Sequence, residues 1–426
     1  MRTKQYKLSA NKVSKTQIKY IDKKLPPAEF ANLLIPLIPK SQEQLAKVTT
    51  LQGAPLGHLE YPKELDIKNH ALALFWQRKN LSGKPESVIA SPRSRNYRTT
   101  SKRKTVLRGS TLYFIFGKKL RPTQAAPFQE SPLEPVEHTH IFSFLQSKLS
   151  EPAFKMLAGH LNYLIIRGNY DERAVIFNVD TLNGPLVHKI KIIAKHLQSL
   201  AENVVAAYIY LDPSHSDYYL ESRRPTDPVS FKKLFGKTNL SVKYANCRLN
   251  FHPTSFSQIN ESMVPVMLNK AHELLSPTPE MRLLDLYCGY GLFSHFFAAD
   301  YKQVIGIDAE GAAIRSAIAN SKINSASRNT RFIPNRIAES LASVLPAVTI
   351  PETIILDPPR QGPKDNVISS LSFRNPKQVL HVFCGVDQIP SSLREWQDNG
   401  YLPIRIVPLD MFPGSANLEI LILLQR

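Results

Sequence analysis

The order of apolar runs after about Met263 constrains the fold of this chain more than any other feature. Short strand-like runs alternate there with helix-like segments, a pattern typical of parallel strands joined by crossover helices. The strand-like runs read RLLDLY, QVIGID, TRFI, ETIILD and QVLHVF. The last two runs, YLPIRIVPL and LEILILL, have no helix between them, which predicts an antiparallel hairpin at the edge of the sheet. The fold class expected for this part is therefore α/β, with a closing hairpin.

The rest of the chain divides into two further regions. At 426 residues the chain is too long for one ordinary core, so two or three domains are expected. From Ser87 onward, runs such as TLYFIFG and LNYLIIRG accompany a helix-like segment, VHKIKIIAKHLQSLAENV, which predicts an α+β region. The predicted domains are a basic extension at 1–85, a central α+β domain at 86–250 and an α/β domain at 251–426.

Positive charge is concentrated in the first third of the chain. The whole chain has 54 Lys and Arg against 35 Asp and Glu, a formal net charge of +19. Residues 1–120 alone have 24 basic and 7 acidic residues, a net charge of +17. This asymmetry predicts an anionic partner, although a solubilising tail has the same composition. Interleaved aromatic residues such as Tyr97, Tyr113 and Phe114 favour nucleic acid over a membrane.

Several classes of protein are disfavoured by what the sequence lacks. No apolar run approaches the roughly 20 residues of a membrane helix, and the basic N-terminus has no apolar segment like that of a secretory signal. The three cysteines, Cys247, Cys288 and Cys384, lie far apart without a CxxC spacing, so neither a disulfide framework nor a metal site is expected. We therefore expect a cytoplasmic protein with no metal, no membrane partner and no obligate protein partner.

A glycine turn follows the first strand of the α/β region, in LLDLYCGYGLFS. Such turns bind ligands because backbone amides and a helix N-terminus converge there, here around Gly289 and Gly291. Asp308 ends the next strand, where a carboxylate accepts hydrogen bonds from both ribose hydroxyls of a nucleoside. A third strand ends in Asp357, followed by two prolines and Arg360. This order of motifs resembles that of the Rossmann-like class I S-adenosylmethionine-dependent methyltransferases.

Each of these motifs alone has a second interpretation. A GxG turn is weak evidence by itself, and Asp308 also fits an aspartate that caps a helix. Dinucleotide binding is disfavoured, because Ser294 stands where that fingerprint has its third glycine and because DPPR follows the third strand.

A longer series of motifs narrows the resemblance. In order, the chain contains FHPTSFSQIN, LDLYCGYGLFS, GIDAE, LDPPRQG, FCG and DMFPGSANLEILILL. Together they resemble the tRNA/rRNA uracil-5-methyltransferase family, whose members form 5-methyluridine. The resemblance is good over 239–426, thin over 91–179 and absent from 1–80. It implies S-adenosylmethionine as cofactor and RNA, either tRNA or ribosomal RNA, as partner.

The chemistry of that family requires a thiol and a base. Uracil C5 is a poor nucleophile for a sulfonium methyl group, and a thiolate added at C6 turns the ring into an enolate whose C5 attacks. A base must then remove the C5 proton so that the thiol is eliminated. By resemblance, Cys384 is the nucleophile and Glu419 is the base. The alternatives are a small buried hydrophobe for Cys384 and a surface carboxylate on an edge strand for Glu419.

The resemblance also assigns the cofactor site. The residues that it implies are Gln258, Tyr287, Gly289, Gly291, Asp308 and Asp357. Asp308 would hold the ribose, Asp357 would lie between cofactor and uracil, and Arg360 would give electrostatic support near the base or a phosphate. Arg95, Tyr97 and Arg98 resemble a basic-aromatic strand that contacts RNA, whose target uracil would have to be flipped out.

Some positions depart from the family pattern. Gly385 follows Cys384 where the family has Cys-Asn-Pro, Asn417 replaces a histidine two residues before the base, and Leu292 replaces an asparagine after the second glycine. The four N-terminal cysteines of members with an iron–sulfur cluster are missing. These departures leave open which RNA is modified and at which position.

Three hypotheses follow from the sequence. The favoured one is an enzyme that transfers a methyl group from S-adenosylmethionine to C5 of a uridine in structured RNA. The second is a methyltransferase that acts on an exocyclic nitrogen of a nucleobase, which needs no cysteine. The third is a non-catalytic RNA-binding protein on the same fold.

Overall fold

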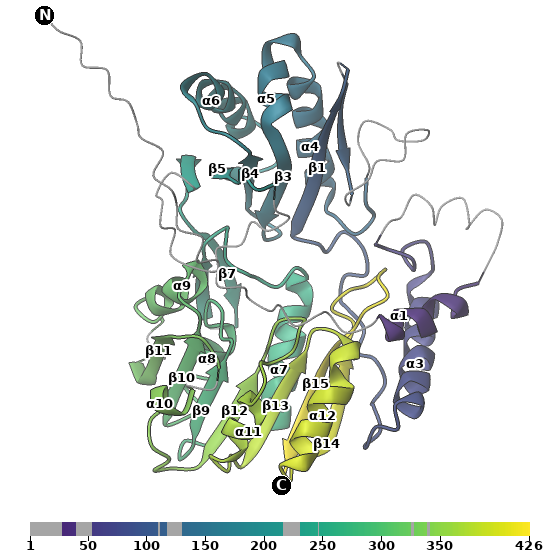
Figure 1. Cartoon of the computed structure of the whole chain (residues 1–426), viewed down its shortest axis with the longest axis vertical. Coiled ribbons are helices and arrows are strands. Elements are labelled where there is room, and N and C mark those ends of the chain that lie inside the picture. Colours follow the sequence, from purple (N-terminus) through teal and green to yellow (C-terminus); the bar gives the residue numbers. More distant parts are fainter. Residues whose placement is uncertain are drawn as a thin grey trace, which may run out of the picture.

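The computed structural model describes residues 28–39, 53–109, 111–116, 130–215, 231–245, 247–324, 328–338 and 341–426. These residues form a seven-stranded sheet, a six-stranded sheet and a two-stranded sheet that lies between the two larger ones (Figure 1). The seven-stranded sheet belongs to the C-terminal part of the chain and the six-stranded sheet to the central part.

The C-terminal sheet has the strand order β11-β10-β9-β12-β13-β15-β14. Its first five strands are parallel, whereas β15 pairs antiparallel with both β13 and β14. The strands are β9 (Arg282–Leu286), β10 (Gln303–Asp308), β11 (Thr330–Pro334), β12 (Glu352–Leu356), β13 (Gln378–Phe383), β14 (Leu402–Leu409) and β15 (Glu419–Gln425). The expected α/β fold class with a closing antiparallel hairpin is confirmed. The carboxyl ends of the parallel strands meet at one edge, where β15 begins.

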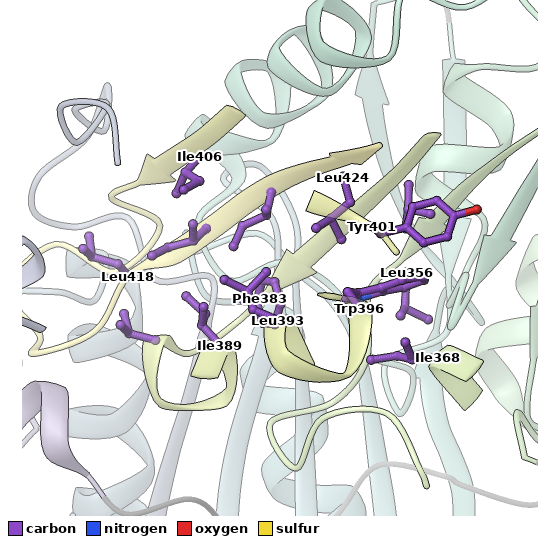
Figure 2. Packing of buried hydrophobic residues seen from close by; sticks show 14 of the residues in the cluster. Leu356, Ile368, Phe383, Ile389, Leu393, Trp396, Tyr401, Ile406, Leu418 and Leu424 are labelled. Carbon is purple, nitrogen blue, oxygen red and sulfur yellow. The ribbon is translucent and has the colours of Figure 1, made fainter. Parts of the chain in front are cut away.

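Helices cover both faces of this sheet. They are α7 (Val264–Leu275), α8 (Leu292–Phe296), α9 (Ala312–Asn320), α10 (Leu341–Val344), α11 (Val367–Ser372) and α12 (Ile389–Asp398). One core cluster joins α10, α11 and α12 to one face, and a second joins α7 and α8 to the other. Figure 2 shows Leu393 and Trp396 of α12 packed near Phe383 of β13 and Leu424 of β15. Each side chain of this size stabilises the fold by about 2 to 3 kcal/mol through its burial.

The central part is an α+β unit, as expected. Its sheet has the order β2-β1-β3-β4-β5-β6, and only β4 and β5 pair in parallel. The strands are β1 (Thr100–Arg108), β2 (Thr111–Ile115), β3 (Leu161–Gly168), β4 (Arg173–Val179), β5 (Val204–Leu211) and β6 (Phe231–Gly236), and the helices are α4 (Val136–Leu149), α5 (Lys155–His160) and α6 (Gly184–Gln198). The hairpin β7 (Leu240–Tyr244) and β8 (Cys247–Phe251) packs in the same core cluster as strands of both large sheets. The central and C-terminal parts therefore share buried apolar surface.

Two helices from the predicted extension at 1–85 pack against the C-terminal part. These are α1 (Glu29–Leu34) and α3 (Tyr61–Arg78), which lie beside α12, β14 and β15 in Figure 1. Their buried side chains belong to the same core cluster as those of α12 and β15. The segment after α3 then runs along β14, because the Ile89 amide donates to the Pro408 carbonyl oxygen and the Asp410 amide donates to that of Ile89. The described part of 1–85 thus completes the C-terminal core.

A buried ion network attaches α3 to the loop that leads into β15. The Lys68 Nζ donates to Glu64 Oε1 at 2.8 Å and to Asp410 Oδ1 at 2.7 Å, and all three side chains are fully buried. The Tyr61 hydroxyl donates to Asp410 Oδ2 at 3.0 Å. Because the two carboxylates share one ammonium group away from water, loss of Lys68 would leave Asp410 without a cation and Glu64 with Arg95 alone. The network therefore fixes the chain just before Glu419.

Two kinds of feature are absent from the part of the chain that the structure describes. Its helices are all too short or too polar to cross a lipid bilayer. Its His, Cys, Asp and Glu side chains form no group of three or more that is placed to bind a metal ion.

Candidate active site

Cys384 and Glu419 lie next to each other at the carboxyl edge of the C-terminal sheet. Cys384 directly follows β13, and Glu419 is the first residue of β15. The two strands pair antiparallel with Phe383 opposite Ile420, so the next position along places Cys384 opposite Glu419. The Glu419 side chain is only 1% exposed, and its Oε1 has no hydrogen-bond partner in the structure. A buried, unpartnered carboxylate oxygen at this edge is a group available to a ligand.

The surroundings of Cys384 favour the thiol over the thiolate. Burial raises the pKa of the Cys384 thiol to about 12, and the carboxylates of Glu419 and Asp357 act in the same direction. A hydrogen bond from Gln388 and the charge of Arg360 lower this pKa. Cys384 thus rests as a thiol and needs a base, or a change in the charge around it, to react.

Gln388 is the side chain that donates a hydrogen bond to the sulfur. Its Nε2 lies 3.5 Å from Cys384 Sγ, and the thiol lies 3.9 Å from the Pro358 carbonyl oxygen, to which it donates. The side chain of Gln388 is buried, and its Oε1 has no partner in the structure. Sequence reasoning missed this residue, because an amide four positions after a cysteine carries no signal by itself.

Two of the departures from the family pattern lie beside the thiol. A Cβ atom at Gly385 would be 3.6 Å from Gln388 Nε2 and 3.8 Å from Asn417 Oδ1, both ordinary contact distances. Asn417 donates from Nδ2 to the Cys384 carbonyl oxygen at 3.1 Å. Asn417 therefore fixes the backbone that carries the sulfur, and the absence of a side chain at 385 leaves room between the two amides.

The site also holds two carboxyl groups whose protonation is shifted. Burial raises the pKa of Glu419 to about 8, with Arg360 acting in the opposite direction. Burial also raises the pKa of Asp357 well above its ordinary value, and the carboxylates of Glu419, Asp285 and Asp308 raise it further. Buried carboxyl groups with raised pKa values near a cysteine are typical of acid–base chemistry.

The glycine turn has the backbone conformation of a ligand-binding loop. Gly289 and Gly291 have φ angles of 56° and 85°, and Tyr287 has the left-handed value of 63°, which is uncommon for an aromatic residue. The Gly289 amide donates to Asp308 Oδ2 at 2.8 Å, which connects the turn to the end of β10. A Cβ atom at Gly291 would lie 2.7 Å from the His295 ring, so this position requires glycine.

The expected cofactor residues fit a nucleoside sulfonium on three observations. No heavy atom lies within 4 Å of a Cβ built on Gly289, so the turn has an open side. Asp308 is only partly buried, at the end of β10 beside that turn. Gln258 and Tyr290 of the turn line the same narrow gap, which is too small for a water molecule and which brings the SFSQ motif to the turn. The Cys288 side chain of the same turn is buried.

Asp285 is a second residue that sequence reasoning missed. Its Oδ2 accepts hydrogen bonds from the Ser294 amide at 2.9 Å and the Ser294 hydroxyl at 2.5 Å. Burial raises the pKa of Asp285 to about 7, although both bonds from Ser294 lower it. Ser294, which replaces the third glycine of a dinucleotide fingerprint, therefore holds α8 against β9. The signal for Asp285 was a single acid inside the apolar strand LLDLY.

The expectation that Arg95, Tyr97 and Arg98 form a strand is wrong, and Tyr97 is too buried to contact RNA. The first strand begins only at Thr100, and Arg98 makes an isolated bridge to Asn260. Tyr97 is fully buried and donates to the Pro413 carbonyl oxygen at 2.9 Å. Arg95 donates to backbone carbonyl groups of the 56–59 turn and to Glu64. These side chains stabilise the junction between residues 53–98 and the loop before β15.

Comparisons with known proteins agree with this geometry. The family model described as tRNA (uracil-5-)-methyltransferase matches residues 173–426. The chain belongs to this family. An RNA methyltransferase of Geobacter sulfurreducens is 23% identical over 97% of this chain and 83% of its own length, and one of Staphylococcus aureus is 24% identical over 86% and 80%. An RNA methyltransferase of Caldanaerobacter subterraneus is 30% identical, but the match covers only 45% of this chain and 42% of that relative.

A solved structure has the same fold. The tRNA (uracil-54, C5)-methyltransferase of Pyrococcus abyssi, in complex with S-adenosyl-L-homocysteine, is 22% identical, with a TM-score of 0.64 over 88% of this chain and 86% of that chain. At this identity the similarity supports the fold. Family membership confirms the predicted recognition, and it confirms the class of S-adenosylmethionine-dependent RNA methyltransferase with S-adenosylmethionine as the family's cofactor.

Proposed function

We propose that this protein methylates C5 of a uridine in structured RNA through a covalent bond between Cys384 and C6 of the uracil. The observation that carries the proposal is the position of Cys384 opposite Glu419, whose side chain is buried and whose Oε1 has no hydrogen-bond partner. Both groups lie at the sheet edge that also holds the glycine turn, Asp308 and Asp357. A thiol and a base beside a nucleoside-binding turn are what addition at C6 and proton removal at C5 require.

The reaction follows in balanced steps. The Cys384 thiolate adds to C6, and the electron pair of the C5–C6 bond moves onto the C4 carbonyl oxygen. S-adenosylmethionine would supply the methyl group: the enolate C5 would bond to the methyl carbon as the bond from that carbon to the sulfonium sulfur breaks, with S-adenosylhomocysteine as the leaving group. Glu419 then accepts the C5 proton, the C5–C6 double bond forms again, and the thiolate leaves C6.

The raised pKa of Glu419 suits this role. A carboxylate whose pKa is about 8 is a stronger base than an ordinary glutamate and still ionises in mildly alkaline solution. Because Glu419 opposes ionisation of Cys384, a protonated Glu419 favours the thiolate. The same carboxyl group would thus help the thiolate to form when it is neutral and remove the C5 proton when it is charged.

The cofactor would be held by the residues around the glycine turn. Gly289 and Gly291 would allow close backbone approach, Asp308 would accept hydrogen bonds from the ribose, and Tyr287 and Gln258 would contact the ligand. Asp357 would lie between cofactor and uracil, because its pKa responds to both Glu419 and Asp308. These roles remain proposals for this chain.

RNA is the proposed partner of this protein, and the cytoplasm is the proposed location of the protein. The net charge of +17 over residues 1–120 supports binding to phosphates. Residues 1–24 contain eight Lys and Arg and a single acid, which predicts a basic arm. This arm lies outside the described residues, and its contribution stays a prediction. The relative from Pyrococcus abyssi is by its description a tRNA enzyme, which makes tRNA the first substrate to test here.

A methylation assay separates the proposal from its alternatives. RNA is incubated with the protein and labelled S-adenosylmethionine, and the modified nucleosides are identified by mass spectrometry. The proposal predicts 5-methyluridine with the wild type and none with Cys384→Ala. Label on an exocyclic nitrogen that persists in Cys384→Ala supports the second hypothesis, and RNA binding without methyl transfer supports the third.

A further inference from the structure

A basic cleft lies at the opposite end of the C-terminal sheet from Cys384. It has a volume of about 470 Å³ and is lined by residues at or just before the amino ends of β9, β10, β11 and β12. The lining residues are Arg282, Lys302, Gln303, Arg328, Asn329, Thr330, Arg331, Thr349 and Ile350. Four of these nine residues are cations and none is an acid, so the cleft has a positive electrostatic potential.

Three of the cations are available to a ligand. Lys302, Arg328 and Arg331 are exposed, and among the described residues their side chains have no hydrogen-bond or ion-pair partner. Arg282 differs, because it binds Glu352 at 2.7 Å and Gln303 at 2.8 Å. Glu352 is itself bound by Arg374, so one carboxylate compensates two guanidinium groups and leaves a further positive charge beside the cleft.

Two polar atoms of the lining residues are also without partners. Asn329 Oδ1 and Thr330 Oγ1 are buried, and neither has a hydrogen-bond partner in the structure. The amide of Asn329 is fixed by donation to the carbonyl oxygens of Ala298 and Tyr301. Of these two atoms only the Thr330 hydroxyl can donate to an anion, because Asn329 Oδ1 is an acceptor. A hydroxyl without a partner next to unpaired cations is consistent with a phosphate site, because a phosphate accepts from the cations and from the hydroxyl.

We propose that this cleft binds phosphate groups of the substrate RNA. The proposal rests on the proposed function, since it takes the polyanion to be the RNA that is methylated. The amino and carboxyl edges of a five-residue strand are separated by roughly 17 Å, a distance that a folded RNA spans. RNA held by its target base at the catalytic edge would thus reach the cleft with another part of its backbone, which sets the register of the RNA without reading its sequence.

The test measures RNA affinity as a function of salt for two triple variants. The cleft variant is K302Q/R328Q/R331Q. The matched control is K191Q/K195Q/R394Q, which removes the same charge from exposed residues of α6 and α12, outside both the cleft and the basic first third of the chain. Binding of bulk tRNA is measured by filter retention across a salt series, and thermal unfolding shows that both variants fold.

The proposal predicts that the RNA affinity of the cleft variant depends less steeply on salt than that of the wild type, whereas the control variant keeps the wild-type dependence. Each lost phosphate contact reduces the slope of log affinity against log salt by about 0.7 to 0.9, so a reduction of about 2 is expected, with affinity about tenfold or more lower at low salt. Equal slopes for the cleft and control variants overturn the proposal. Stabilisation of the wild type by inorganic phosphate alone, with RNA binding unchanged in the cleft variant, overturns the assignment to RNA. Since methyl transfer is not measured, the outcome is independent of the proposed reaction.

A second inference comes from the side-chain amide of Gln388, which lies beside the Cys384 sulfur. We infer that Gln388 is a positioning residue that holds the Cys384 thiolate through its Nε2–H donor. The donor lies 3.5 Å from the sulfur on a buried side chain at the start of α12, and its Oε1 stays without a partner. An amide that donates to an anion stabilises it relative to the neutral thiol. The groups that face Cys384 are otherwise Glu419 and Asp357, which oppose the thiolate, and Arg360, which favours it.

Alkylation of Cys384 by iodoacetamide as a function of pH tests this role, because it reports the thiolate without any methyl transfer. Gln388→Ala should move the alkylation profile upward by about one pH unit, which lowers the rate about tenfold at a given pH. Gln388→Glu has the same shape and no donor when it is ionised, so it should lower the alkylation rate at a given pH at least as much. An unchanged profile in both variants overturns the inference, even if Cys384 proves to be the nucleophile.

Discussion

Replacement of Glu419 by glutamine should make Cys384 more reactive while it removes methyl transfer. The pKa of Cys384 is about 12 against an ordinary value of 9.0, and Glu419 follows burial as the second cause of this shift. At pH 9, a thiol with a pKa of 12 is roughly one part in a thousand thiolate, because each pKa unit is a factor of ten. Two unit charges 4 Å apart in an effective dielectric of 20 interact by about 4 kcal/mol, and a more distant pair by less. We therefore expect Glu419→Gln to lower the pKa of Cys384 by one to two units, which raises alkylation at pH 9 by about 10- to 100-fold.

The difference in alkylation rate between the wild type and Glu419→Gln should depend on pH. The pKa of Glu419 is about 8, so the wild-type side chain is mostly neutral at pH 7 and mostly charged at pH 9. The two proteins should then react alike below pH 8 and diverge above it. Alkylation of Cys384 is followed by peptide mass spectrometry, with buried Cys288 as the internal reference.

The same variant should lose about a hundredfold or more of its methyl transfer, since proton removal from C5 has no base. Glu280→Gln, which changes an exposed glutamate elsewhere, is the control and should change neither rate. Alkylation that is unchanged or slower in Glu419→Gln at pH 9 would refute the electrostatic argument. Methyl transfer at the wild-type rate would refute the role of Glu419 as base.

Further predictions concern the cofactor and the fold. Asp308→Asn should weaken binding of S-adenosylmethionine, measured by calorimetry, by about tenfold or more, because the ribose loses a charged acceptor while the bond from Gly289 is kept in weaker form. Lys68→Met should lower the free energy of unfolding, measured with urea, by about 3 to 5 kcal/mol, because it leaves Glu64 and Asp410 buried without their ammonium partner; an effect below 1 kcal/mol would contradict this. Gly306→Ala should lower it by about 1 to 3 kcal/mol, because its Cβ would lie 2.6 Å from two ring carbons of Phe332. Deletion of residues 1–24 should flatten the salt dependence of RNA affinity, and an unchanged slope would count against an RNA-binding arm.

The sequence predicted the C-terminal fold well because parallel strands have a strong local signature. Runs such as ETIILD and QVLHVF are continuously apolar and are buried on both faces as β12 and β13, and the missing helix between YLPIRIVPL and LEILILL correctly gave a hairpin. Since carboxyl ends of parallel strands share an edge, the expected convergence of Cys384 with Asp357 could also be stated in advance.

What the sequence did not predict depends on contacts between distant segments. Lys68 contacts Asp410, 342 positions away, and no local pattern indicates that α3 completes the core beside β14. The sequence alone suggested that Arg95 and Tyr97 contact RNA, because basic and aromatic residues close together in the sequence are also typical of an exposed RNA-binding surface. In the structure they are satisfied by Glu64 and the Pro413 carbonyl oxygen, which only the tertiary fold supplies.

The most direct test of the account is a trapping experiment with RNA that contains 5-fluorouridine. Fluorine at C5 is not removed as a proton is, so an enzyme that adds its sulfur to C6 and transfers the methyl group stays attached to the ring. The account predicts a stable protein–RNA complex that depends on S-adenosylmethionine, with the methylated fluorouracil on the peptide that carries Cys384. Normal methylation of ordinary RNA without any such complex, or with the ring attached to another residue, would contradict it.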